Sequence, residues 1–175
     1  MKLANQMTLA AYLGNFFQLA YVTNDLEKAI DYFRNELEIK EFTRFESTMD
    51  VLAQGVREQA QIKVGLARVN DTQIEIIEPV SGAVDIYRNA LPATEGFALV
   101  FHHLGFKVHG DDEKWQQALE TVRAKGHAFC VLGEVAPIVK FGYIDMREEL
   151  GHFVELVQFS SDLQAQMDQL PNQAA

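Results

Sequence analysis

The chain has 175 residues, of which 48% are hydrophobic and 23% are charged, and its net charge is −10. This length and composition predict one globular domain, or two small fused halves, with a hydrophobic core. The acidic balance argues against nucleic acid and anionic membranes as main partners, because their phosphate groups repel a negatively charged protein.

The N-terminal region and the single cysteine bear on where the protein works. The first twenty residues contain one lysine and an apolar stretch that Asn15 and Gln18 interrupt, which predicts neither a signal peptide nor a membrane span. Cys130 is the only cysteine, and an intrachain disulfide is therefore excluded. Together these features favour a cytoplasmic location, where thiols stay reduced.

The first half of the chain predicts one strand, one helix and three further strands. Alternating side chains over 16–23 predict the first strand. Asn24 or Asp25 then caps a helix over 25–37, whose apolar residues recur at helical spacing. The further strands are predicted over residues 39–45, 61–69 and 72–78, the last two joined by a tight turn at 70–71. The polar segment 46–61 predicts a mobile loop.

A connecting segment with two prolines and a glycine follows at 79–95, and the same order of elements then begins again. A strand over 99–108 leads to a helix that Asp111 or Asp112 caps and that ends at Gly126. Three more strands are predicted over residues 128–132, 139–146 and 152–159. The repeat divides the chain into an N-terminal extension (1–15), a first module (16–80), a linker (81–96), a second module (97–159) and a C-terminal tail with a short helix (160–175).

Four polar residues lie inside apolar strand segments, where an inward polar side chain needs a partner. They are Gln18, Glu75, His103 and Glu155. The first two are 57 positions apart (75 − 18) and the last two are 52 apart (155 − 103), which suggests a duplicated module with one shared site. One imidazole, two carboxylates and one amide oxygen would suit a divalent metal ion.

These segments together resemble the vicinal oxygen chelate superfamily, the group of glyoxalase I, methylmalonyl-CoA epimerase, bleomycin resistance proteins and extradiol dioxygenases. The resembling stretches are FQLAYVTNDLEKAIDYFRNELEI, QIEIIEPV, FHHLGFKVHGD and YIDMREELGHFVELVQ, and they cover roughly residues 16–159. The resemblance implies an α+β fold in which two βαβββ modules form a curved, mostly antiparallel sheet around a concave metal site.

Carried over residue by residue, the resemblance implies that Gln18, Glu75, His103 and Glu155 are metal ligands, a set similar to that of one branch of glyoxalase I. Three oxygen ligands and one imidazole suit Zn, Ni, Co, Mn or Mg. Gln18 stands where the dioxygenases have their first histidine, which disfavours iron because its facial triad needs two imidazoles. The bleomycin resistance proteins lack the metal set and match less well.

The resemblance implies a metal-dependent lyase or isomerase that moves a proton next to the metal-chelated carbonyl of a small metabolite. Glu155 and Glu75 are the candidate bases, and the sequence does not rank them. An extradiol-type dioxygenase and a non-enzymatic protein that sequesters a small molecule are the alternatives. The resemblance also implies a homodimer, because many members pair modules across subunits, and it leaves open whether these modules pair within or between chains.

Simpler roles are open for several of these residues. Glu75 would pair with Lys63 or Arg68 on a neighbouring strand, and Glu78 at the strand end competes with it as a ligand. Alternation places His102 on the helix side of its strand, as a packed residue. Other cations are surface charges by default, or anchors for an anionic part of a substrate: Lys107, Lys140 and Arg147.

Overall fold

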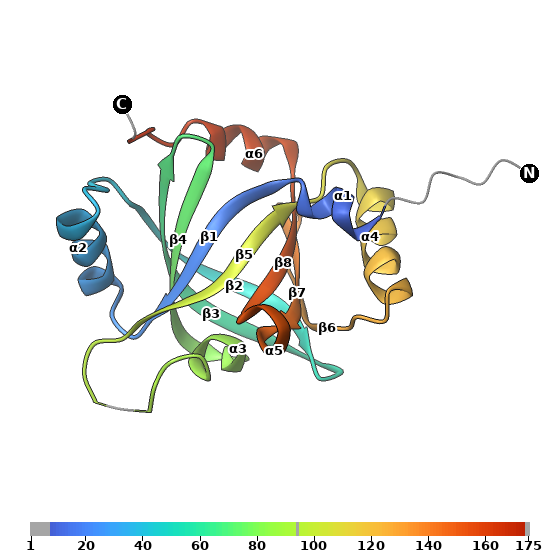
Figure 1. Cartoon of the computed structure of the whole chain (residues 1–175), viewed down its shortest axis with the longest axis horizontal. Coiled ribbons are helices and arrows are strands. Elements are labelled where there is room, and N and C mark those ends of the chain that lie inside the picture. The colour runs from blue at the N-terminus through green and yellow to red at the C-terminus, as the bar shows by residue number, and fades with distance from the viewer. Residues whose placement is uncertain (1–7, 94, 174–175) are drawn as a thin grey trace, which may run out of the picture.

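The structure is a computed structural model, and it describes residues 8–93 and 95–173. In the described residues, eight strands close into a barrel in the order β1-β4-β3-β2-β6-β7-β8-β5 (Figure 1). The strands are β1 (Phe16–Thr23), β2 (Thr43–Ala53), β3 (Val56–Val69), β4 (Thr72–Gly82), β5 (Leu99–Lys107), β6 (Phe129–Val135), β7 (Val139–Met146) and β8 (His152–Phe159). The helices are α1 (Leu9–Leu13), α2 (Leu26–Glu36), α3 (Asp85–Arg88), α4 (Asp112–Ala124), α5 (Arg147–Leu150) and α6 (Ser161–Asp168).

The chain repeats one βαβββ order, β1-α2-β2-β3-β4 followed by β5-α4-β6-β7-β8, and this confirms the predicted α+β fold. In each module the first and last strands pair in parallel, β1 with β4 and β5 with β8. The modules join along two antiparallel seams, β1 with β5 and β2 with β6. Because both seams lie within one chain, the two modules close the barrel without a second subunit.

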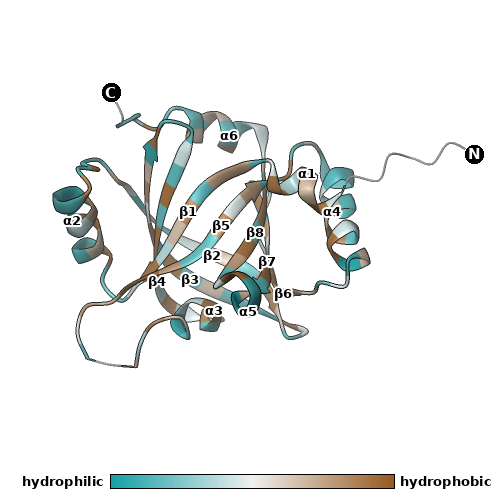
Figure 2. Cartoon of the chain, in the orientation of Figure 1, coloured by the Kyte–Doolittle hydropathy of each residue, from teal (hydrophilic) through white to brown (hydrophobic). Residues whose placement is uncertain are grey.

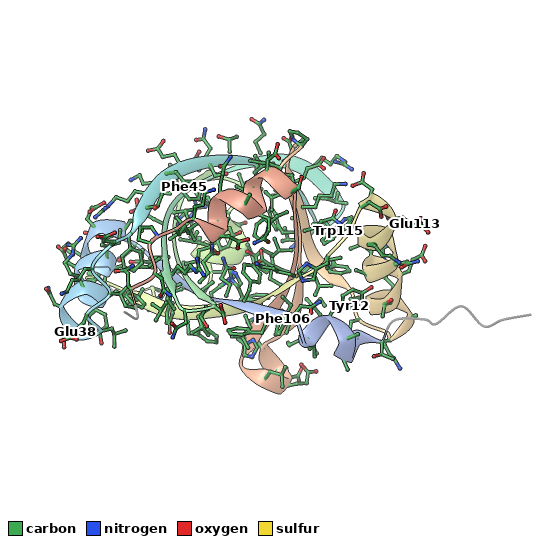
Figure 3. All side chains as sticks on the ribbon, turned by 90° about the horizontal axis from the view of Figure 1, so that it is seen from above. Tyr12, Glu38, Phe45, Phe106, Glu113 and Trp115 are labelled. Carbon is green, nitrogen blue, oxygen red and sulfur yellow. The ribbon has the colours of Figure 1, made fainter. Side chains whose placement is uncertain are left out.

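Three hydrophobic clusters account for the packing. The largest lies inside the barrel, and the other two lie under α2 and α4 on its outside. Figure 2 shows hydrophilic residues along the outer side of α2 and hydrophobic residues along the strands. In Figure 3, Glu113 lies on the outer side of α4 and Trp115 on the side that faces the barrel, where it is buried as expected. Asp25 and Asp111 cap α2 and α4 by accepting backbone N–H hydrogen bonds.

Two of the short helices cover the ends of the barrel. In Figure 3, α6 crosses over the ring of strands, and Met167 of this helix packs against the interior cluster. α3 lies near the opposite end in Figure 1 and inserts Tyr87 into the same cluster. None of the helices among the described residues is long and apolar enough to cross a membrane.

The segment predicted as a mobile loop, 46–61, is instead a long hairpin of β2 and β3, and the strand predicted over 39–45 begins only at Thr43. In β2 of this hairpin the polar side chains face outward, while Met49 and Val51 point into the barrel and are buried. A two-residue turn at Gln54 and Gly55, both with positive φ, joins the strands. The prediction was wrong because the outer face of this hairpin is not covered by a helix and therefore carries few apolar residues.

A pair of β-bulges lies on the β1–β5 seam, next to Gln18 and His103. Each strand contains one extra residue, Phe17 immediately before Gln18 in β1 and His102 immediately before His103 in β5. The bulge interrupts the alternation and turns His102 into the barrel, where its ring packs on Phe153 at 4.8 Å between centroids. The prediction that His102 faces the helix side is therefore wrong.

Candidate metal centre

The strand register brings the four predicted ligands around two small residues at the centre of the sheet. Ala20 of β1 lies between Glu75 of β4 and His103 of β5. Gly105 of β5 lies between Gln18 of β1 and Glu155 of β8. Four long polar side chains can converge inside the barrel because the positions between them carry almost no side chain. This arrangement follows the approximate twofold relation of the two modules.

His103 lies close to both glutamates. His103 Nε2 lies 3.2 Å from Glu155 Oε2 and 3.6 Å from Glu75 Oε2. The His103 side chain has no exposed surface, whereas those of Glu155 and Glu75 are 7% and 17% exposed. Two ligand atoms of one metal ion, each at about 2.1 Å in octahedral geometry, are about 3.0 Å apart. The observed separations are slightly longer than that.

Gln18 reaches the same region through an oriented amide. Its Nε2 donates a 2.6 Å hydrogen bond to Oε1 of Gln73, whose own Nε2 donates to Met167 Sδ at 3.5 Å. Gln18 Oε1 is left buried and without a hydrogen-bond partner. A Cβ atom at Gly105 would lie 2.9 Å from this oxygen, and only glycine leaves room for it there. The structure therefore places the amide oxygen of Gln18 over β5.

Two tyrosines surround Glu155. Tyr143 of β7 is its cross-strand neighbour, and a hydrogen bond from Tyr143 acts against the raised pKa of this carboxyl. The hydroxyl of Tyr143 lies 3.1 Å from that of Tyr87 in α3, and both rings are buried. Burial raises the pKa of both phenols, and they remain protonated donors at neutral pH. The carboxyl group of Glu155 therefore lies next to a pair of buried phenols.

The chemistry of these donors fits a divalent cation. Two carboxyl groups, the free His103 Nε2 and the free Gln18 Oε1 are electron-rich groups in a buried region, and among the described residues no lysine or arginine forms an ion pair with either glutamate. Within residues 8–93 and 95–173, however, no three His, Cys, Asp or Glu side chains are already gathered around one metal position. Coordination by all of these groups would therefore require small side-chain shifts.

Access to these groups is restricted. Two surface cavities of about 220 and 280 Å³ lie elsewhere, one beside Trp115 and Lys140 and the other beside Lys107 and Gln164. Neither is lined by the predicted ligands. His103 is fully buried, and of the four predicted ligands Glu75 is the most exposed, at 17% of its side chain.

The competing roles for nearby charged residues are resolved by their contacts. Lys63 pairs with Glu78 at 2.8 Å rather than with Glu75. Glu78 also accepts the backbone N–H of Leu26 at the start of α2, and its carboxylate is therefore structural. Arg147 pairs with Asp145 at 2.7 Å. Of the surface cations predicted as substrate anchors, Lys140 also has a carboxylate partner, Asp112.

Comparison with known proteins identifies the family. A family model described as the Glyoxalase/Bleomycin resistance protein/Dioxygenase superfamily matches residues 17–138. The chain belongs to this superfamily. A search of curated protein sequences gives no significant match. The resemblance drawn from the sequence is thus confirmed at the level of the superfamily.

Solved structures of this superfamily share the fold at low sequence identity. A hypothetical protein from Bacillus halodurans is 13% identical, with 83% of this chain and 94% of that chain covered and a TM-score of 0.55. A methylmalonyl-CoA epimerase from Streptomyces coelicolor is 15% identical, with 84% and 95% covered and a TM-score of 0.55. The methylmalonyl-CoA epimerase from Mycobacterium tuberculosis is 15% identical, with 93% and 96% covered and a TM-score of 0.50. These similarities establish the fold alone.

The sequence did not reveal which residues contact the four predicted ligands of this superfamily member. Gln73 had a detectable signal, because it lies two positions before Glu75 and thus on the same face of the strand. Tyr143 sits in an apolar strand and would be read as a core residue. The roles of His102 and Tyr87 had no signal, since one depends on a bulge and the other on where the linker folds.

The buried acids and bases predict how stability depends on pH when no metal is bound. Burial raises the pKa of Glu75 and Glu155 to about 8, and it lowers the pKa of His102 and His103 to about 3. Between pH 4.5 and about 8 the folded state therefore keeps carboxyl protons that the unfolded chain has already lost. Between about pH 3 and 6.5 the folded state binds fewer histidine protons than the unfolded chain does. As pH rises, the carboxyl effect lowers the free energy of unfolding and the histidine effect raises it. The two oppose each other up to pH 6.5, and above it only the carboxyl effect remains.

We expect the chelator-treated protein to lose stability between pH 6.5 and 8, by about 2 kcal/mol for each carboxyl that deprotonates in this window. Urea unfolding at a series of pH values measures this loss. The variant Glu155→Gln should show a smaller one, because it has one titrating carboxyl fewer. A free energy of unfolding that stays constant or rises from pH 6.5 to 8 would contradict the expectation.

Proposed function

We propose that the protein is a divalent-metal-dependent lyase or isomerase that moves a proton next to a carbonyl of a small oxygenated metabolite. The observation that carries the proposal is the convergence of His103 Nε2 with the carboxylates of Glu155 and Glu75, at 3.2 and 3.6 Å. The unpartnered, buried Gln18 Oε1 supports it as a fourth donor. Electron-rich groups that face one another in a buried region are unfavourable unless a cation or protons lie between them.

Gln18, Glu75, His103 and Glu155 would hold the metal ion, and Zn, Ni, Co, Mn and Mg match these donors. When bound, the ion would polarise a chelated carbonyl and make the neighbouring C–H more acidic. Glu155 would then take the proton, because it lies beside the Tyr143 phenol and burial raises its pKa towards the range in which a base works at neutral pH. The same carboxyl would return the proton to the substrate. Glu75, with no orienting hydrogen bond in the described residues, would serve mainly as a ligand.

The donor set disfavours the extradiol dioxygenase alternative. Such enzymes hold iron through two imidazoles and one carboxylate. His102 is the nearest second imidazole, but its Nε2 contacts the Ile86 carbonyl at 3.0 Å and its Nδ1 contacts His103 Nδ1 at 2.8 Å. Both of its nitrogens are therefore engaged, which leaves His103 as the one buried histidine of the described residues with a free ring nitrogen.

The nature of the substrate is a further part of the proposal. The similar structures include methylmalonyl-CoA epimerases, one of them in complex with 2-nitronate-propionyl-CoA. An acyl thioester with an acidic C–H next to its carbonyl is therefore a suitable first probe. We also propose a cytoplasmic location and a homodimer, on the basis of the single cysteine and of family resemblance.

The test combines metal analysis with an exchange assay. The protein is purified without chelators, analysed for metals, and reconstituted with each of the five ions. Each form is then incubated in D2O with methylmalonyl-CoA and with a panel of 2-hydroxy and 2-oxo compounds. We expect about one ion per chain and metal-dependent deuterium uptake next to a carbonyl. Bound iron with oxygen uptake on a catechol would favour the dioxygenase, and failure to bind any ion would favour the sequestering protein.

A further inference from the structure

His102 is a buried histidine for which the proposed proton transfer has no role. Its side chain is turned into the barrel by the β5 bulge, and the residue is 2% exposed. The ring stacks on Phe153 with an interplanar angle of 32° and lies 5.3 Å from the ring of Tyr87. It is therefore held in one plane by aromatic neighbours on two sides.

The hydrogen bonds of His102 have only one consistent direction. Its Nε2 is 3.0 Å from the carbonyl oxygen of Ile86, and because a carbonyl only accepts, Nε2 must carry the hydrogen. The ring is 2% exposed and packs against aromatic side chains, which favours its neutral form, and the neutral ring has no second N–H. Its Nδ1 is therefore an acceptor, and it lies 2.8 Å from Nδ1 of His103.

The same reasoning extends to His103. Since His102 Nδ1 accepts, His103 Nδ1 must donate, and the hydrogen of this bond is therefore on Nδ1 of His103. Nε2 is then the nitrogen of His103 that faces the two glutamates. That nitrogen makes no hydrogen bond and lies 3.2 Å from Glu155 Oε2. The chain of two bonds thus leaves the nitrogen that faces the carboxylates free to bind a metal.

We propose that His102 is a positioning residue that fixes the tautomer and ring orientation of His103, with the backbone carbonyl of Ile86 as its anchor. This rests on the proposed function insofar as it concerns a metal ion, but the control of the tautomer is independent of any metal. Partners that fix the other nitrogen of a metal-binding histidine commonly change metal affinity by 10–100-fold. Ile86 belongs to α3, in the segment that joins the two modules. This helix therefore helps to orient His103 through the Ile86 carbonyl and His102.

Two substitutions separate positioning from packing. His102→Phe keeps an aromatic ring against Phe153 but removes the acceptor for His103 Nδ1–H. His102→Asn loses the ring but keeps an oxygen where the acceptor nitrogen was. His109→Phe, at an exposed histidine outside the barrel, is the matched control. The tautomer of each histidine is measured in metal-free, ¹⁵N-labelled protein by two-bond ¹H–¹⁵N correlation spectra, and zinc affinity by competition with a chromophoric chelator.

In the wild type we expect His103 to carry its hydrogen on Nδ1. In His102→Phe we expect the hydrogen to move to Nε2, where it can bond to Glu155, and zinc affinity to fall 10–100-fold. His102→Asn should restore the wild-type tautomer and most of the affinity, and His109→Phe should change neither. A folded His102→Phe with the wild-type tautomer and an affinity within about twofold of the wild type would overturn the inference.

Two further outcomes separate this inference from the proposed function. A wild-type spectrum with the hydrogen on Nε2 of His103 overturns the inference, even if His102→Phe does not fold. A tautomer change in His102→Phe together with no zinc binding by the wild type supports the inference and overturns the proposed function.

Discussion

Replacement of His103 by alanine is expected to abolish metal binding at micromolar metal concentrations. The substitution removes the imidazole that lies between the two glutamates and leaves the Glu155 and Glu75 carboxylates without it. Loss of a ligand should cost more than the 10–100-fold that loss of an outer partner costs. Zinc competition measures the affinity, and the visible spectrum of the cobalt-loaded protein reports directly on the coordination.

The control for this substitution is His109→Ala, which removes an exposed histidine elsewhere on the chain. It should retain wild-type affinity and the cobalt spectrum. Thermal unfolding of the metal-free forms checks that His103→Ala still folds, because removal of a fully buried side chain leaves a cavity. If folded His103→Ala binds zinc as tightly as the wild type, the proposed metal centre is wrong.

The main elements of the fold could be predicted because their signals are local. The strands β7 and β8 have the residue ranges that alternation predicted, and Asp25 and Asp111 cap the two long helices as their positions suggested. The repeated order of elements then implied two modules with corresponding faces. The hairpin of β2 and β3 was missed because its outer face is solvated and its composition is that of a loop.

The candidate centre was predictable only in part, for a different physical reason. Period-2 alternation on separate strands placed Gln18, Glu75, His103 and Glu155 on one face, and the register then brought them together. What orients them depends on contacts between distant segments. The bulge at His102 appears only when β1 and β5 are paired, and the carbonyl it contacts comes from a helix that the sequence presented as a linker.

The two carboxylates have different surroundings, and this difference decides which of them should act as the base. Tyr143 lies beside Glu155 on the neighbouring strand and acts against its raised pKa, and the Tyr143 hydroxyl contacts that of Tyr87. Glu75 has no such partner in the described residues, and its side chain is more exposed, at 17% against 7%. A general base works best when a neighbour fixes it towards the proton that it removes. The surroundings of Glu155 meet this condition.

Glu155→Gln is therefore expected to lower kcat by about 10²–10⁴-fold on the compound that the exchange assay identifies. Glutamine has nearly the same shape and can still accept the hydrogen bond of Tyr143, but its amide cannot take up the proton. The measurement is the rate of deuterium uptake at saturating substrate and saturating metal. Under these conditions a weaker affinity for the metal no longer contributes to the loss.

Two further variants show whether the loss belongs to the base. Glu78→Gln, on the same strand as Glu75 but paired with Lys63, should keep kcat within about twofold of the wild type. Glu75→Gln should weaken metal binding as Glu155→Gln does, yet lose less of kcat once metal is saturating. If instead Glu155→Gln keeps full turnover while Glu75→Gln loses it, the base is Glu75. Tyr143 would then serve to position Glu155 as a metal ligand.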